Sequence, residues 1–194
     1  MALREANTVT YNNYIDAAGK NGRFDEAQKA FEDAVASRHV DAMTYASYID
    51  AAGRNGQFAE AQSAFDAAVR NKVADKITYM VYLDVLVKNG QKAEADHIYQ
   101  KLGLPLQCKV ERGMQMVDLH DYSHGAGYLA LKEFISNRSC PDRFGLIPGR
   151  GCREDGNHLA FRSYLIDMVQ TNLPEWTCKT DPQNEGVILM EKKR

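Results

Sequence analysis

The sequence of 194 residues lacks several features that would define its function class at once. No stretch approaches the roughly eighteen apolar residues that a membrane span needs. Its four cysteines include no Cys-x-x-Cys pair, which disfavours a zinc ribbon. They are widely spaced in the second half, and both halves are apolar enough to form a core without a disulfide framework. We therefore expect an intracellular chain with reduced thiols, no metal and no other cofactor.

The sequence also lacks an excess of positive charge. It carries 24 Lys and Arg against 26 Asp and Glu, a formal net charge of −2 at pH 7. Residues 1–105 hold 12 basic and 14 acidic side chains, and residues 106–194 hold 12 of each. Proteins that bind nucleic acid mainly by neutralising phosphates usually show a basic excess. Any such binding by this chain must therefore depend on local patches.

What the sequence does have is a unit of 34 residues that occurs three times, over about 8–41, 42–75 and 76–104. Residues 8–41 and 42–75 are identical at 19 of 34 positions. Each unit opens on Thr-Tyr, breaks at Asn-Gly and continues with Glu-Ala. Apolar residues spaced as on an amphipathic helix flank the Asn-Gly turn, so each unit predicts a pair of helices. This period predicts an all-α solenoid over residues 1–104, with a concave binding surface.

The first unit, "VTYNNYIDAAGKNGRFDEAQKAFEDAV", resembles a pentatricopeptide repeat. It also resembles a tetratricopeptide repeat in its length and in the Ala27–Phe31 spacing, but the Thr-Tyr opening and the terminal Asp41 and Asp75 favour the former. Pentatricopeptide arrays usually bind single-stranded RNA, whereas tetratricopeptide arrays usually bind peptides.

The resemblance implies that two residues per unit read a base: the residue after Thr-Tyr and the last residue of the unit. These are Asn12 and Asp41 in the first unit, a combination that suits a pyrimidine edge. The second unit has Ala46, which cannot hydrogen bond, and the third has Met80. We therefore expect loosely selective RNA binding. A purely structural role for Asn12 and Asp41, at a helix start and as a cap between repeats, remains open.

Residues 105–194 follow a different pattern, which predicts a second domain with an α/β sandwich fold. Strands are expected at 114–120, 144–147, 176–179 and 186–190, and helices at 127–137 and 159–169. The order β-α-β-α-β-β predicts a four-stranded sheet with two helices on one face.

This second stretch resembles the small MutS-related (Smr) domain along nearly its whole length. The resemblance rests on Val117-Asp118-Leu119-His120, Gly149-Arg150-Gly151 and the run "NEGVIL" at 184–189. Smr domains nick RNA or DNA and occur fused behind pentatricopeptide repeats, so the resemblance implies an endonuclease. The chain departs from the family pattern at Asp121, where Gly is usual, and at Cys152–Asp155, where the loop usually continues with His-Ser.

The residue chemistry is consistent with that implication. Asp118 and His120 lie two apart in an expected strand and project to the same face. An imidazole can take the proton of a ribose hydroxyl while a carboxylate orients its ring, so Asp118 and His120 are the candidate catalytic pair. The turn at Gly149, Arg150 and Gly151 offers backbone amides and a guanidinium to a phosphate.

Two functions remain open at this stage. The first is an RNA-binding protein that cuts a phosphodiester without a metal, with single-stranded or structured RNA as its partner, on the ribosome or away from it. The second is a non-catalytic adaptor whose repeats hold a protein or ribonucleoprotein.

The remaining expectations concern location and assembly. Met1–Arg4 lead directly into the repeats, so we expect no signal or transit peptide within this sequence. We expect a cytoplasmic monomer without membrane contact, or a protein of an organelle such as a mitochondrion or plastid if a transit peptide has been removed.

Overall fold

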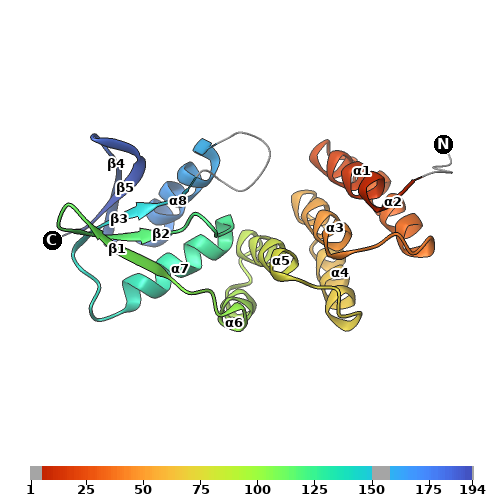
Figure 1. Cartoon of the computed structure of the whole chain (residues 1–194), viewed down its shortest axis with the longest axis horizontal. Coiled ribbons are helices and arrows are strands. Elements are labelled where there is room, and N and C mark those ends of the chain that lie inside the picture. The colour runs from red at the N-terminus through yellow and green to blue at the C-terminus, as the bar shows by residue number, and fades with distance from the viewer. Residues whose placement is uncertain (1–5, 150–157, 194) are drawn as a thin grey trace. The chain divides into compact units, whose positions relative to one another are not determined.

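The computed structural model describes residues 6–149 and 158–193, which divide into two compact units. The first ends at Leu102 and the second begins at Gly103. Figure 1 shows the first unit, coloured red to yellow-green, as helices alone and the second, green to blue, as strands with two helices. Within the described ranges, no helix is both long enough and apolar enough to cross a membrane.

The first unit contains the helix pairs that the repeats predict. The helices are α1 (Thr8–Lys20), α2 (Phe24–Ala36), α3 (Ala42–Arg54), α4 (Phe58–Arg70), α5 (Lys76–Lys88) and α6 (Lys92–Leu102). Each pair turns at Asn-Gly, where Gly22, Gly56 and Gly90 have φ values of 72°, 74° and 70°. Because this left-handed backbone strains most side chains, the glycine determines where each first helix ends. The expected helical-repeat region is confirmed.

Small residues allow the first helices of successive repeats to pack closely, α1 on α3 and α3 on α5. A Cβ added at Gly19 of α1 would lie only 2.5 Å from Cβ of Ala51 in α3. A Cβ added at Gly53 of α3 would overlap the side chain of Val85 in α5. These contacts join the ends of the three helices. Their starts are joined by hydrogen bonds from Asn12 Nδ2 to Asp41 Oδ1 at 3.3 Å and from Thr78 Oγ1 to the Ala42 carbonyl at 3.5 Å, so the starts of α1, α3 and α5 lie in one row.

Aromatic rings join each second helix to the following repeat. Phe31 of α2 stacks on Tyr48 of α3 with 4.2 Å between ring centroids, and Phe65 of α4 stacks on Tyr82 of α5 at 4.1 Å. Stacked rings at such distances add to the apolar contact that burial provides. Phe31 and Phe65 therefore connect neighbouring repeats.

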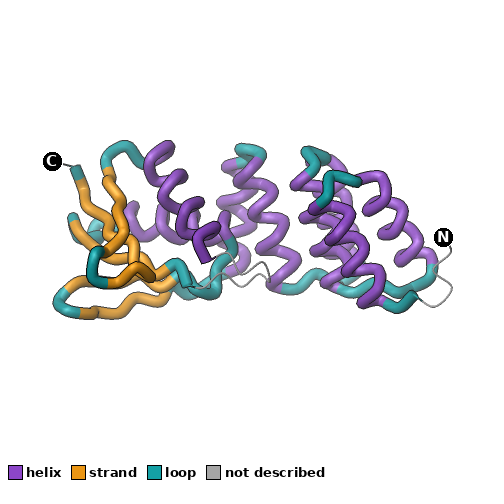
Figure 2. Tube along the Cα trace, turned by 90° about the horizontal axis from the view of Figure 1, so that it is seen from above, coloured by secondary structure: helices purple, strands orange, loops and turns teal. Residues whose placement is uncertain are grey.

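The second unit is a mixed sheet with two helices. All the strands of the described chain, coloured orange in Figure 2, lie in this unit. Its strands are β1 (Gln107–Glu111), β2 (Met114–Asp118), β3 (Arg143–Ile147), β4 (Trp176–Asp181) and β5 (Asn184–Lys192), and its helices are α7 (His124–Ser136) and α8 (His158–Asn172). The strand order is β1-β2-β3-β5-β4. Only β2 and β3 pair in parallel; the other neighbours are antiparallel.

The expectation of four strands is wrong by one, because β1 precedes the predicted set. All five residues of β1 are exposed, although its sequence Gln-Cys-Lys-Val-Glu alternates polar and apolar residues. It exists because its backbone pairs with β2 from Gln107↔Asp118 to Glu111↔Met114. From β2 onward, the order of strands and helices is the predicted one.

Both helices of the second unit cover the same face of the sheet. Phe134 of α7 meets Phe144 of β3 edge-on, with 4.8 Å between ring centroids. Gly127 of α7 leaves room for Phe161 of α8, whose Cζ lies 2.5 Å from where a Cβ would stand at Gly127. The two helices therefore pack side by side, as expected.

The opposite face of the sheet carries a smaller apolar cluster of Met116, Val187 and Leu189, with Met114 and Ile147 packed against it. Gly145 of β3 lies between Met116 and Val187, and a Cβ there would come within 2.6 Å of the Met116 sulfur. The missing side chain thus lets Met116 reach across β3. Asp118 lies two residues after Met116 in β2, so its side chain projects from the same face of the sheet.

Candidate functional site

The first candidate site lies where β2 ends. Asp118 is the last residue of β2 and pairs with Ile147 at the end of β3. The next backbone amide, of Leu119, donates to the Ile147 carbonyl at 2.8 Å. Because β2 and β3 are parallel, the turns that follow them leave the same edge of the sheet.

At this edge, the side chains of Asp118 and His120 are in direct contact. Asp118 Oδ1 lies 2.7 Å from His120 Nδ1 and also accepts a hydrogen bond from the His120 backbone amide at 3.1 Å. Two bonds to one oxygen fix both the ring and the backbone of His120 relative to β2. The Asp118 side chain is 18% exposed, while that of His120 is 48% exposed.

A second carboxylate faces the other nitrogen of the same ring. Asp121 Oδ2 lies 3.3 Å from His120 Nε2. The hydrogen bond to Asp118 raises the pKa of His120 above 6.5, its charge adds to this, and Asp121 raises the pKa further. Partial burial and the positive charge of Lys109 on β1 oppose the rise. His120 therefore holds its proton more tightly than an ordinary histidine.

The turn after β3 reaches the same place. Gly149 has a φ of 71°, and a Cβ added there would come within 2.5 Å of His120 Cα. Only a residue without a side chain permits this approach of the two backbones. The structure thus brings together Asp118, His120 and Gly149, which the sequence singled out from two distant segments. The other two predicted residues of this turn, Arg150 and Gly151, lie outside the described residues.

A further histidine, four residues after His120 in the sequence, was not predicted as a site residue. His124 begins α7, directly after Ser123, whose hydroxyl accepts the Ala126 amide at 3.4 Å as the helix cap. The His124 ring meets Phe161 and Tyr164 of α8 edge-on, at 5.1 Å in each case. These ring contacts hold His124 between α7 and α8. No group of three or more His, Cys, Asp or Glu in the described part of the chain is arranged to hold a metal.

The second candidate site is the row formed by the starts of α1, α3 and α5. Asn12 Nδ2 donates to Asp41 Oδ1 at 3.3 Å, so the structure brings the predicted base-reading pair together. Asn12 is only 8% exposed, and its Oδ1 is buried without a hydrogen-bond partner in the described structure. Ala46 and Met80, the equivalents of Asn12, are buried too.

Asp41 has a structural task as well. Its Oδ1 accepts the backbone amide and the hydroxyl of Thr44, at 2.8 and 2.9 Å, which caps α3. Burial alone would raise the pKa of Asp41, but the hydrogen bonds from Thr44 and Asn12 outweigh it and lower the pKa below 3.8. Asp75 caps α5 through Thr78 in the same way. The capping role left open by the sequence is therefore present.

Exposed apolar residues recur in this row at the repeat period, a feature that the sequence analysis missed. Val9, Met43 and Ile77 are 63%, 45% and 47% exposed. Each directly precedes the Thr-Tyr of its unit, which was the available signal. Val9 also borders a hollow along α1 that includes Thr10, Asn13 and Tyr14.

Basic residues recur at the same period near the other end of these helices: Lys20, Arg54 and Lys88. Lys20 lies 2.9 Å from Asp16, and Arg54 lies 2.7 Å from Asp50. Each of these two cations thus has a carboxylate partner on its own helix. These carboxylates offset the two positive charges at this end of the helices.

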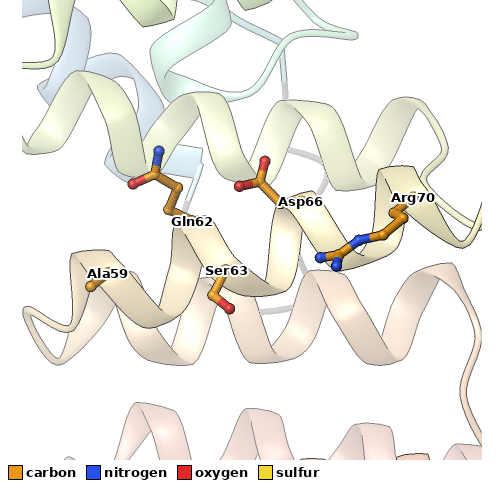
Figure 3. A pocket seen from close by; sticks show the side chains of 5 residues that line it. All are labelled: Ala59, Gln62, Ser63, Asp66 and Arg70. Carbon is orange, nitrogen blue, oxygen red and sulfur yellow. The ribbon is translucent and has the colours of Figure 1, made fainter.

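Another hollow runs along α4 and is lined by Ala59, Gln62, Ser63, Asp66 and Arg70. Figure 3 shows that these side chains all project from one helix. Because all five lining residues belong to α4, the hollow has only one wall and is an open part of the helix surface.

Comparison with known families concerns the first unit. A pentatricopeptide (PPR) repeat model matches residues 9–38, and a tetratricopeptide repeat model matches residues 48–101. Neither match extends into the second unit. A comparison with curated proteins finds no match. The first unit is therefore a helical-repeat region of PPR and tetratricopeptide type.

Proposed function

We propose that this chain binds single-stranded RNA through its repeats and that its second unit is an Smr-like domain acting on the phosphodiester backbone. The observation that carries RNA binding is that Val9, Met43 and Ile77, in the row of helix starts, are exposed at the same position of three successive repeats. Single-stranded RNA presents unstacked bases, whose flat faces need apolar partners. A peptide partner would not require the same exposed residue once per repeat.

In this proposal, Val9, Met43 and Ile77 supply affinity for RNA, whereas Asn12 and Asp41 add little selectivity for a particular base. Asn12 is buried and bonded to Asp41, which caps α3. In the other repeats Ala46 and Met80 offer no hydrogen bond to a base. Asn12 Oδ1 is buried as well, so in the described structure it is not accessible to a base. Binding is loosely selective.

The test of RNA binding uses two matched pairs of variants. Val9→Ala with Met43→Ala removes apolar contact from the row. Val35→Ala with Val69→Ala removes equally apolar residues that are also 34 apart and 45% and 36% exposed, but lie on α2 and α4. We expect the first pair to raise the Kd for a short fluorescent single-stranded RNA roughly tenfold, since base stacking contributes on the order of 1 kcal/mol per base. Equal effects of the two pairs would contradict the proposal.

The Smr-like activity rests on the contact of Asp118, His120 and Gly149 at one sheet edge. Asp118 orients Nδ1, so Nε2 is the nitrogen that can take the proton from a ribose 2′-hydroxyl. The 2′-oxygen then bonds to phosphorus, the bond from phosphorus to the 5′-oxygen breaks, and that oxygen takes a proton from water. This transesterification needs no metal.

The test of cleavage is incubation of structured and single-stranded RNA with the protein in the presence of a chelator. We expect products that His120→Ala abolishes and Asp118→Asn strongly reduces, because the first removes the base and the second the group that orients it. Cleavage by the His120→Ala protein at the wild-type rate would show that another group is responsible.

A second function is favoured by specific observations. His120 has a carboxylate at each ring nitrogen, and Lys20 and Arg54 are paired with acids. Such a chain could hold a protein or a ribonucleoprotein through its repeats without cutting. For this non-catalytic adaptor, the cleavage test gives no products, and the two pairs of variants affect the binding of bare RNA equally.

A further inference from the structure

The side chains around His120 form a chain of three: Asp118, His120, Asp121. The two carboxylates differ in how firmly they are held. Asp118 ends β2, is 18% exposed and also accepts the His120 amide. Asp121 lies in the turn before α7, is 56% exposed, and stands at the longer distance of 3.3 Å from the ring. The Asp118 side chain is therefore held against the His120 ring, whereas the Asp121 side chain can move away from it.

Two carboxylates on one imidazole leave only one favourable protonation state. A neutral ring donates from one nitrogen and presents a lone pair at the other, and a lone pair facing a carboxylate is repelled. Both contacts are favourable only when both nitrogens carry a proton. The described arrangement therefore favours the imidazolium form of His120, which has no lone pair with which to accept a proton.

We infer that Asp121 caps Nε2 of His120, the nitrogen that the proposed reaction uses as its base, and keeps the site inactive as long as this contact holds a proton there. A carboxylate oxygen and a phosphate oxygen are both anionic acceptors, so they compete for the same N–H. Gly149 lies against His120 from the turn after β3, so an anion bound at Nε2 would also lie beside that turn. This inference rests on the proposed function, because it concerns the regulation of the same site.

Among the described residues, charged groups face His120 from three elements: Asp118 from β2, Asp121 from the following turn and Lys109 from β1. Gly149, from the turn after β3, is uncharged. The two acids raise the pKa of His120 and Lys109 lowers it. As the pH rises through the pKa of His120, the ring loses its proton and its attraction for Asp121. Removal of the cap is therefore coupled to formation of the free base.

The test follows the His120 ring by NMR in the whole chain, using the pH dependence of its Cε1–H signal. We expect Asp121→Asn to lower the pKa of His120, because it removes a negative charge next to Nε2 and leaves Asp118 in place. Asp142→Asn is the matched control: Asp142 is exposed and precedes β3, at the opposite end of the strand from the site. It makes the same change in charge and should leave the His120 pKa unaltered.

A second measurement titrates inorganic phosphate into the same proteins below the pKa of His120. We expect Asp121→Asn to bind phosphate at His120 roughly two- to fivefold more tightly than wild type, the scale of an exposed ion pair. If Asp121→Asn changes neither the His120 pKa nor phosphate binding, or if Asp142→Asn changes both equally, there is no cap.

Neither measurement requires RNA, so the cap and the proposed function can fail separately. If both measurements succeed but no RNA is cut by Asp121→Asn at any pH, the cap stands and the nuclease proposal fails. If RNA is cut, we expect the rate to rise with pH, and the rise to begin at lower pH in Asp121→Asn than in wild type. An unchanged pH profile in an active Asp121→Asn enzyme would overturn the cap.

Discussion

At the scale of single residues, the contact between Gly149 and His120 does most to define the sheet-edge site. Gly149 combines a φ of 71° with a backbone approach that leaves no room for a Cβ. Gly113, in the turn between β1 and β2, has a φ of 75° but no atom within 4 Å of its Cβ position. A comparison of the two glycines therefore distinguishes the effect of a left-handed backbone from the effect of close contact with another backbone.

We expect Gly113→Ala to destabilise the second unit by about 1 kcal/mol through the left-handed backbone alone. Gly149→Ala should cost more, because His120 must also move. Urea unfolding measures both losses, and the NMR signal of His120 should shift only in Gly149→Ala. Equal costs and an undisturbed His120 signal in both variants would show that the contact is loose.

At the scale of residues, the sequence predicted the neighbourhood of Asp118 and His120 but not its backbone. The expected strand continued to His120, whereas β2 ends at Asp118 and His120 lies in the turn after it, where the two side chains hydrogen bond. The contact of Asp121 with Nε2 depends on the conformation of the turn after β2, which no periodicity encodes. The same holds for Gly149, whose partner is 29 residues away in the sequence.

At the scale of helices and strands, the caps of the repeats allow a matched comparison. Asp41 and Asp75 both cap the first helix of the next repeat through a Thr three residues later. Only Asp41 also receives a hydrogen bond from the preceding repeat, from Asn12. Asp75→Ala should cost about 1 kcal/mol for the lost cap. Asp41→Ala should cost more, because Asn12 then keeps a buried amide group with no acceptor.

Chemical denaturation at pH 7 measures this difference, and the pH dependence checks its origin. The pKa of Asp41 is lower in the folded chain than its ordinary 3.8, so the folded state favours the carboxylate. The contribution of Asp41 to stability is therefore fully present above the pKa that Asp41 has in the unfolded chain. It is lost as the pH falls through the lower pKa that Asp41 has in the folded chain. A difference between the two variants that persists unchanged at pH 2 would contradict the assigned cause.

The elements that the sequence predicted well are those with a strong period. The 34-residue unit, the Asn-Gly turns and the apolar stripes together determine six helices. Strand β1 was missed because its alternation includes only two apolar residues, Cys108 and Val110, and α7 begins three residues before its expected start because Ser123 caps it at His124. Pairing to a neighbouring strand and side-chain capping decide such cases.

At the scale of the whole molecule, the net charge of −2 limits how RNA can be held. Lys20, Arg54 and Lys88 recur once per repeat, and the first two are paired with acids on their own helices. RNA phosphates must compete with those carboxylates. If three cations each take one phosphate, the slope of log K against log salt concentration should be about −2 for a single strand.

This slope separates the two proposed functions. A protein partner held by apolar contacts would give a slope near zero, whereas a strongly basic RNA-binding protein would give a much steeper one. We expect Asp16→Asn with Asp50→Asn to tighten RNA binding severalfold, because Lys20 and Arg54 then lose their competing partners. Asp33→Asn with Asp66→Asn makes the same change in charge on α2 and α4. If both pairs tighten binding equally, net charge alone governs the affinity and the row of first helices is not the RNA surface.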